Sequence, residues 1–264
     1  MSKVVSWLSV FFANCKLSIN KSMAYRLNFL LEALISLLFT LVGPIMQYLL
    51  FTQTKGYPGW NLNEILLFQG VLLFSMGLKS TLFGNFKSQF ISLVRQGDLD
   101  RLLLRPYSPN NTLLATSFNQ DGIVTMLTGL AIIIYISVSL NLAVTFSAVV
   151  LFVLCMVFAM IMGVSLDIFH NGIIVLTVAD GGLQGIMNAY LRFAEYPIQI
   201  YPKLLQVAFT TVFPIAMYIY FPTQALLGRM DLTLLYALAG ILLFVFMSLV
   251  FWHIAIKKYT SAGG

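Results

Sequence analysis

The sequence predicts an all-α, polytopic membrane protein, and three observations support that fold class. Hydrophobic residues make up 59% of the 264-residue chain and charged residues only 9%, a composition far too apolar for a soluble protein. The apolar residues form several runs of about 20, the length that a helix needs to cross a bilayer. The basic residues behind the net charge of +6 lie beside these runs, a position typical of the cytoplasmic membrane surface. This placement argues against nucleic acid as a partner.

An amphipathic helix is expected before the first span. Between Val4 and Ile19, apolar side chains recur every three or four residues, and polar side chains such as Lys16 occupy the other face. This pattern is typical of a helix that lies in the plane of the membrane interface. We therefore predict an interface helix over residues 1–25. It contains Cys15, and neither cysteine of the chain indicates a disulfide or a metal site.

Six transmembrane helices are expected after it, separated by short polar connections. The predicted spans are approximately 27–50, 62–83, 122–140, 142–166, a fifth that begins near 172, and 232–254. Asn141 marks a tight connection. A second turn is indicated by Asp167, His170 and Asn171, which precede the fifth span. Lys79 lies near the end of the second span, and we expect its ammonium group to reach back to the membrane surface.

The stretch between the fifth and sixth spans, residues 192–229, has a long uncharged interior that could be mistaken for another span. Pro214 and Pro222 divide it into pieces too short to cross a bilayer. An additional span would also place Lys257 and Lys258 outside, against the positive-inside bias. We therefore predict a re-entrant helical hairpin that enters from the outside, with both termini of the chain in the cytoplasm.

The most highly charged part of the chain is the loop after the second span, residues 85–110. Apolar residues at spacings of three and four before and after Gly97 predict two short amphipathic helices, with Gly97 and Asp98 as the break and cap between them. A segment with this many charges cannot cross the bilayer. It is either a solvated loop that faces lipid headgroups or a surface that docks a partner protein.

The fifth span is unusually polar. Asp180, Gln184 and Asn188 are four residues apart and share one face of a helix, and such a face is costly toward lipid. We expect these three residues to line a substrate route, although a neighbouring helix could also satisfy the Asp180 carboxylate. Gly181 and Gly185 indicate close helix packing rather than chemistry.

Catalytic motifs are missing from the sequence. It has no nucleophile elbow, no zinc-protease motif, no two histidines at the spacing of a metal site and no phosphate-binding Gly-rich loop. His170 has no second ligand at a spacing that would hold a metal. We therefore predict no catalytic residue, no metal site and no cofactor in this chain.

Two stretches of sequence, together with this arrangement of elements, resemble the permease subunit of an ABC-2-type ATP-binding-cassette transporter. RQGDLDRLLLRPYSP at 95–109 and FAEYPIQIYP at 193–202 are similar to one branch of that family. The resemblance covers essentially the whole chain, so residues 1–264 are expected to form a single transmembrane domain.

The resemblance implies roles for two segments. The loop after the second span would couple the permease to an ATPase, through Phe90, Ile91, Val94, Arg95, Gly97, Asp98, Asp100, Arg101, Arg105 and Pro106. The hairpin region would form an external gate, with Glu195, Tyr196, Pro197, Tyr201 and Pro202. The gate residues could equally form an interfacial aromatic belt, and the two interpretations are compatible.

The resemblance also implies partners and a location. The partners would be an ABC ATP-binding subunit, which would bind ATP and Mg, a second copy of this permease or a paralogous permease, and membrane lipid. The complex would export an amphiphilic, lipid-like, drug or peptide substrate across the cytoplasmic membrane of a bacterium. An ATP-independent secondary transporter and an integral-membrane scaffold are the alternatives.

Overall fold

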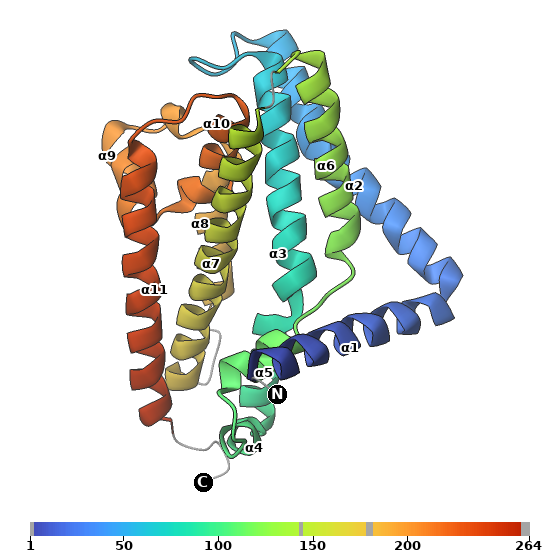
Figure 1. The fold of residues 1–264 in the computed structure, drawn as a ribbon, viewed down its shortest axis with the longest axis vertical. Coiled ribbons are helices and arrows are strands. Elements are labelled where there is room, and N and C mark those ends of the chain that lie inside the picture. The colour runs from blue at the N-terminus through green and yellow to red at the C-terminus, as the bar shows by residue number, and fades with distance from the viewer. Residues whose placement is uncertain (1–2, 143–144, 178–181, 260–264) are drawn as a thin grey trace.

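Five long helices define the architecture of the chain. The computed structural model describes residues 3–142, 145–177 and 182–259, and within these ranges it contains helices but no strand. Five described helices are long and apolar enough to cross a membrane: α2 (Arg26–Gln53), α3 (Leu62–Gln96), α6 (Gly122–Ser139), α7 (Phe146–Thr177) and α11 (Thr233–Lys257). Figure 1 shows α3 in the middle of the bundle, between α6 and α7. The predicted all-α, polytopic membrane fold is confirmed.

The first helix, α1 (Lys3–Ala24), lies across the end of the bundle rather than along it (Figure 1). The indole Nε1 of Trp7 donates a hydrogen bond to the carbonyl oxygen of Asn111 at 2.9 Å, which ties α1 to α5 (Pro109–Ala115). The ring of Phe11 meets the edge of Phe118, with centroids 6.4 Å apart. The predicted N-terminal helix is therefore present, and it runs at a steep angle to α2.

Helix α3 is the central element because it is both long and well capped. Asn61 and Glu64 form a reciprocal capping box, in which each side chain accepts a hydrogen bond from the other residue's backbone N–H. The helix has 35 residues. At a rise of about 1.5 Å per residue it is about 52 Å long, more than the hydrocarbon core of about 30 Å requires. Its last turns still pack against α7 and α11, where Phe90 and Val94 are buried.

Close backbone contact joins α3 to α6. A Cβ atom at Gly77 would overlap the backbone of Met126, and one at Gly129 would overlap the backbone of Phe74. Helices in lipid gain little from the hydrophobic effect, so close packing at small residues supplies much of their attraction. The pair forms a rigid centre on which the other helices are placed.

The predicted turn at Asp167, His170 and Asn171 is wrong, because α7 continues through all three residues to Thr177. The side chains point into the protein rather than out of a turn, with exposed fractions of 7%, 1% and 0%. A helix continues through polar residues at membrane depth when neighbouring helices satisfy them, and α3 does so for Asp167. The connection at Asn141 is confirmed by its left-handed backbone, with φ of 48°.

The predicted fifth span is also wrong as a single helix that begins near Gly172. After α7 the chain returns through the short helix α8 (Leu183–Arg192) and two 3₁₀ turns, Phe193–Glu195 and Ile198–Ile200. This return path is too irregular to count among the five long apolar helices of the described chain. Asp180 lies outside the described residues.

A helical hairpin follows, inside the predicted range 192–229. Its first leg combines α9 (Lys203–Val207) with a π-helical turn, Ala208–Val212, and its second combines a 3₁₀ turn, Ile215–Tyr218, with α10 (Tyr220–Leu226). Pro214 lies at the reversal between the legs. Gly240 on α11 leaves room for the carbonyl group of Thr211, which a Cβ atom would overlap. The second leg is almost completely buried against α3 and α7.

The charged loop differs from its prediction in two respects. Phe90, Ile91 and Val94 lie on the continuation of α3, not on a separate short helix, because no break occurs before Gly97. Gly97 ends α3 in the left-handed conformation with φ of 75°, as expected of a C-terminal glycine. The next helix, α4 (Leu99–Leu103), is short, and the Asp98 side chain forms no capping hydrogen bond to it.

Candidate functional site

A buried ion pair lies midway along α3. The Lys79 ammonium nitrogen is 3.1 Å from Oδ2 and 3.3 Å from Oδ1 of Asp167 on α7. The Lys79 side chain is 21% exposed and that of Asp167 10%, so the prediction that Lys79 reaches the membrane surface is wrong. Charges removed from water are tolerated when they are paired with good geometry, and each charge here neutralises the other.

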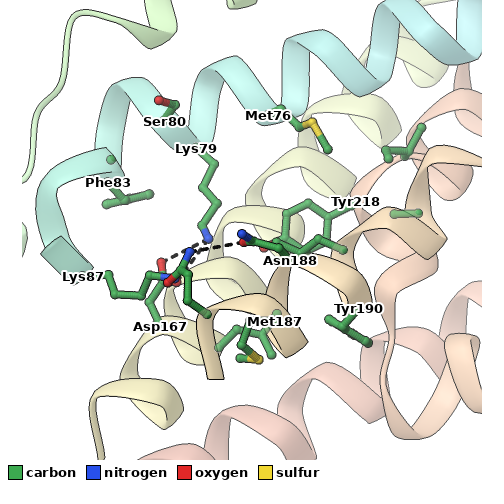
Figure 2. A pocket seen from close by; sticks show the side chains of 16 residues that line it. Met76, Lys79, Ser80, Phe83, Lys87, Asp167, Met187, Asn188, Tyr190 and Tyr218 are labelled. Atoms are coloured by element: carbon green, nitrogen blue, oxygen red, sulfur yellow. Dashed lines mark hydrogen bonds and ion pairs between the residues drawn. The ribbon is translucent and has the colours of Figure 1, made fainter. Parts of the chain in front are cut away.

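Gly163 leaves space for this pair. It lies one turn before Asp167 on α7, and a Cβ atom there would overlap the hydroxyl group of Tyr218 and lie 3.0 Å from Cε of Lys79. A glycine at this position therefore allows the hairpin and α3 to approach α7 at the same point. The second leg of the hairpin brings the Tyr218 ring beside the ion pair (Figure 2).

A cavity of about 320 Å³ opens beside the ion pair, between α3, α7, α8 and the hairpin (Figure 2). Its polar lining consists of Lys79, Ser80, Lys87, Asp167, Gln184, Asn188, Tyr190 and Tyr218. Its apolar lining includes Met76, Phe83, Leu166, Met187, Leu191 and Ile219. The volume falls at the lower end of the range of about 300–1,000 Å³ that is usual for small-molecule sites.

Two of the three predicted route residues lie at this cavity. Gln184 and Asn188 both line it, and the Gln184 amide donates a hydrogen bond to the Asn188 side-chain oxygen at 3.2 Å. Asp180 lies outside the described residues, as does Gly181. A Cβ atom at Gly185 would meet nothing within 4 Å, so the prediction that Gly185 packs against a neighbouring helix is wrong within this chain.

Tyr218 is the cavity residue whose hydrogen bonding is incomplete. Its side chain is 4% exposed, and its hydroxyl group has no hydrogen-bond partner in the described structure. Buried hydroxyl groups nearly always have a partner, because an unpaired one costs about 1–3 kcal/mol. A molecule bound in the cavity would therefore gain by accepting a hydrogen bond from this hydroxyl group.

A second ion pair lies at the N-terminal end of α3. Arg229, which follows the hairpin, binds the buried Glu64 carboxylate through its guanidinium group. Next to it, the Trp60 indole donates to the side-chain oxygen of Gln199 at 3.2 Å, and the Gln199 amide donates to the Tyr220 hydroxyl at 2.8 Å. These contacts fasten both ends of the hairpin region to the start of α3.

The predicted gate residues are Glu195, Tyr196, Pro197, Tyr201 and Pro202, and the structure places them on the short path between α8 and α9. The amide of Gln69 donates to the carbonyl oxygen of Glu195 at 3.5 Å, and the Tyr201 hydroxyl donates to that of Phe193 at 3.0 Å. Pro197 is buried. Pro197 is therefore packed inside and Glu195 contacts α3 through its backbone, whereas Tyr196 and Pro202 are exposed.

The connection between α2 and α3 covers the same end. The ring of Tyr57 meets the edge of Tyr196 with centroids 6.2 Å apart, and its hydroxyl group donates to the side-chain oxygen of Gln47 at 3.0 Å. Burial raises the pKa of the Tyr57 hydroxyl, and the hydrogen bond to Gln47 opposes that shift. Tyr57 is therefore a neutral aromatic anchor at physiological pH.

The residues predicted to couple to an ATPase divide into a buried and an exposed set. Phe90 and Val94 are almost completely buried, and the Phe90 ring packs on Trp252 of α11 with centroids 5.4 Å apart. Arg95, Arg101 and Arg105 are exposed. Ile91, Gly97, Asp98 and Asp100 are half-buried, and Pro106 is exposed.

Two of the exposed residues, Arg101 and Arg105, border a groove at the far end of α3. Its volume is about 520 Å³, and it is lined by Gln89, Ser92, Leu93, Asp98, Arg101, Leu102, Arg105, Thr112, Leu113 and Thr116. The Arg101 guanidinium is 3.1 Å from Oδ1 of Asp98, one turn earlier in the chain. A concave surface rimmed by arginines is suited to an acidic or polar segment of another protein.

The part of the chain that the structure describes contains no group of three or more His, Cys, Asp or Glu residues that could hold a metal ion. With its long apolar helices, its buried ion pair and its charged end, the molecule belongs to the class of multi-pass membrane proteins.

The comparison with protein families identifies the class more closely. Residues 34–263 match the family model described as ABC-2 family transporter protein, and the chain therefore belongs to that family. No curated protein and no solved structure matches the chain. The protein is an ABC-type permease, and members of this family normally leave ATP hydrolysis to a partner subunit.

Sequence reasoning missed the ion pair, although one signal pointed to it. Lys79 and Asp167 are opposite charges within or beside separate apolar runs, and an ionisable group at membrane depth needs a partner. Because the prediction placed Lys79 at the membrane surface and Asp167 in a turn, neither residue needed a partner inside the membrane. Tyr218 carries no comparable signal, because an aromatic residue in an apolar stretch is usual in any membrane protein.

Proposed function

We propose that this chain is the permease subunit of an ATP-driven exporter in the cytoplasmic membrane of a bacterium. A separate ABC ATP-binding subunit, which binds ATP and Mg, would dock on the groove below α3, and both termini would be cytoplasmic. The observation that carries the proposal is the continuity of α3, which joins that groove directly to the Lys79–Asp167 pair and the cavity.

The coupling surface in this proposal is the exposed set, not the buried one. Arg95, Arg101 and Arg105 would contact the ATPase, because they are exposed at the groove end of the molecule. Phe90 and Val94 would act as positioning residues that hold the groove rigidly to α11. A movement of the bound ATPase at the groove would therefore displace α3 and α11 together.

The exposed side of the bundle supports a dimeric permease. In the most apolar 18-residue stretch of α2, only 6% of the residues are buried, whereas 61% are buried in the corresponding stretch of α3. Lipid and a second permease copy, identical or paralogous, would cover this surface. The residues between α8 and α9 would form the external gate, because they close the end of the bundle opposite the groove.

The substrate route would pass through the cavity, with Gln184 and Asn188 on its wall. Together with the return path after α7, the five long helices would make six crossings. This count keeps Lys257 and Lys258 on the cytoplasmic side, as the positive-inside bias favours.

One observation favours a second candidate, an ATP-independent secondary transporter. Charged pairs inside a membrane domain are often proton or ion relays, and the Lys79–Asp167 pair would fit that role. Family membership favours the ABC mechanism. Transport that continues when the ATP-binding subunit is removed would favour the secondary transporter.

The experiment that tests the proposal reverses the charge at Arg101 and Arg105 together, in the chain expressed with the ATP-binding subunit that co-purifies with the wild type. We expect the variant to remain inserted and dimeric but to lose most of the co-purifying ATPase and nearly all ATP-driven transport. Lys55→Glu, an exposed charge at the other end of α3, is the matched control and should retain both.

Undiminished co-purification and stimulation of the ATPase after the double reversal would contradict the docking assignment. Labelling with an impermeant thiol reagent provides an independent measurement of orientation. A cysteine at Leu204 should react from outside in intact cells, and one at Leu104 should react only after the membrane is opened, because both positions are exposed on the protein.

A further inference from the structure

We propose that the cavity beside the Lys79–Asp167 pair binds an acidic amphiphile, a molecule with one carboxylate or phosphate headgroup and a hydrocarbon tail. The inference rests on the proposed function only in identifying this molecule with the exported substrate. Binding itself is a property of this chain and can be measured without the ATPase.

The headgroup would meet the Lys79 ammonium. A lysine ammonium has three N–H donors, and the described contacts of Lys79 use at most two of them, on the two oxygens of the Asp167 carboxylate. The remaining donor capacity faces a cavity that Lys79 itself lines. An incoming anionic oxygen could therefore bind Lys79 without displacing Asp167.

Tyr218 supplies the second contact. Tyr218 lines the same cavity, and its buried hydroxyl group has no partner among the described residues. Figure 2 shows the Tyr218 ring near the end of the Lys79 side chain. A headgroup oxygen between them would accept one charge-assisted bond from Lys79 and one bond from Tyr218, and would satisfy the buried hydroxyl.

The rest of the lining suits a hydrocarbon tail. Met76 and Phe83 of α3 face Met187 and Leu191 of α8 across the cavity, and these side chains offer no strong hydrogen-bonding group. Methionine side chains are flexible enough to pack against chains of different shape. The site therefore combines a polar end with an adaptable apolar wall, which a free inorganic ion would not use.

The arrangement favours an anion over a cation. Asp167 is the less accessible member of the pair, with its side chain 10% exposed against 21% for Lys79. A cationic headgroup would have to compete with Lys79 for that buried carboxylate. An acidic headgroup instead adds a second negative partner to the more accessible charge, and the Tyr218 donor strengthens this preference.

The test uses the full-length chain, purified in a neutral detergent and titrated with two amphiphiles that have the same tail length. Laurate carries an anionic head and dodecyltrimethylammonium a cationic one. Native mass spectrometry counts the molecules bound, and the loss of tyrosine and tryptophan fluorescence on titration gives the affinity. We expect one saturable laurate site per chain and at least tenfold weaker binding of the cation.

Tyr218→Phe is the most informative variant, because it removes only the unpaired hydroxyl group and should not impair folding. We expect it to weaken laurate binding about tenfold or more, the usual loss for a hydrogen bond to a charged group. Tyr135→Phe, an exposed tyrosine on α6 remote from the cavity lining, is the matched control and should bind laurate as the wild type does.

A second variant removes the charges without leaving one unpaired. Lys79→Met combined with Asp167→Leu replaces the ion pair by apolar side chains and should abolish the saturable laurate site. The proposal is overturned if this variant and Tyr218→Phe bind laurate as tightly as the wild type, if the cation binds equally well, or if the wild type shows no saturable site.

The source of the acidic amphiphile is resolved by two further measurements. A phospholipid that belongs to the site would add its mass to the wild-type chain before laurate is added, and not to the double variant. A transported substrate would instead stimulate the co-purified ATPase in a Tyr218-dependent way. Undiminished ATPase docking in the Arg101 and Arg105 experiment would contradict the proposed function and leave the laurate-binding result unaffected, so the two proposals can fail separately.

Discussion

The two ion pairs of α3 have similar chemistry but different surroundings. Glu64 pairs with Arg229 at the start of the helix, and Lys79 pairs with Asp167 fifteen residues later, about 22 Å along the axis. In both pairs the carboxylate is buried, with its side chain 6% exposed in Glu64 and 10% in Asp167. The cations differ, since Arg229 is 51% exposed and Lys79 only 21%.

This difference determines what each carboxylate keeps if its cation is lost. Glu64 also accepts a hydrogen bond from the backbone N–H of Asn61 and lies in the first turn of α3, where the helix dipole favours a negative charge. Within the described contacts, Asp167 has only Lys79 as a partner. The Glu64–Arg229 pair is therefore partly solvated and supported by a backbone hydrogen bond, whereas the Lys79–Asp167 pair depends on both of its members.

The largest expected effect comes from Lys79→Met alone. It leaves the Asp167 carboxylate buried without its partner, a situation that costs about 3–5 kcal/mol. We expect little detergent-stable protein by size-exclusion chromatography. The double variant with Asp167→Leu should recover most of it, because an apolar pair replaces a buried ion pair at small cost. A double variant as unstable as the single one would show that the pair itself, not the unpaired charge, stabilises the bundle.

A smaller effect is expected from Asn61→Ala, which removes the side-chain oxygen that caps α3 by accepting a hydrogen bond from the Glu64 backbone N–H. The loss of an N-terminal cap costs about 1 kcal/mol. The melting temperature of the purified protein should therefore fall by a few degrees. Asn28→Ala, which removes an exposed hydrogen bond to Glu32 within α2, is the control and should change the melting temperature less. Equal shifts in the two variants would remove the distinction between a cap and an ordinary surface contact.

The smallest effect is expected from Arg229→Gln. Because Arg229 is half-exposed and Glu64 keeps its backbone partner, the loss should be about 1 kcal/mol or less. Salt screens exposed charges, so raising the ionic strength should narrow the gap between variant and wild type. Thermal unfolding at low and high salt measures both. A loss as large as that of Lys79→Met would make the two pairs equivalent and would contradict the comparison.

Local sequence was sufficient for the features that depend on neighbouring residues. The apolar runs at α2, α6 and α11 and the start of α3 were predicted within a few residues, because bilayer spans need a continuous length of apolar side chains. The end of α3 was predicted too early, because its last turns are amphipathic. Gly97 was predicted as a break, and it ends α3 because glycine adopts the left-handed backbone without a steric cost. The stretch after α8 was predicted as a hairpin because Pro214 and Pro222 divide it into pieces too short to cross a bilayer.

Polar residues inside apolar runs were harder, because their meaning depends on what lies across from them. Asp167 alone resembles a turn residue, and Lys79 alone resembles a residue at the membrane surface. Their contact joins positions 88 residues apart, which no local pattern specifies. Once paired, neither residue needs to end its helix, and this explains why α7 continues ten residues beyond Asp167.

The sequence by itself therefore determined that this chain crosses a membrane as a bundle of helices and where in the chain most of those helices lie. It also determined that one charged segment cannot enter the bilayer. Tertiary structure alone decided that α3 and α7 share an ion pair, that the hairpin brings Tyr218 to it, and that a cavity forms beside them. The reason is physical. Length and hydropathy are summed along the chain, whereas neutralisation of a buried charge depends on atoms a few ångströms away in space.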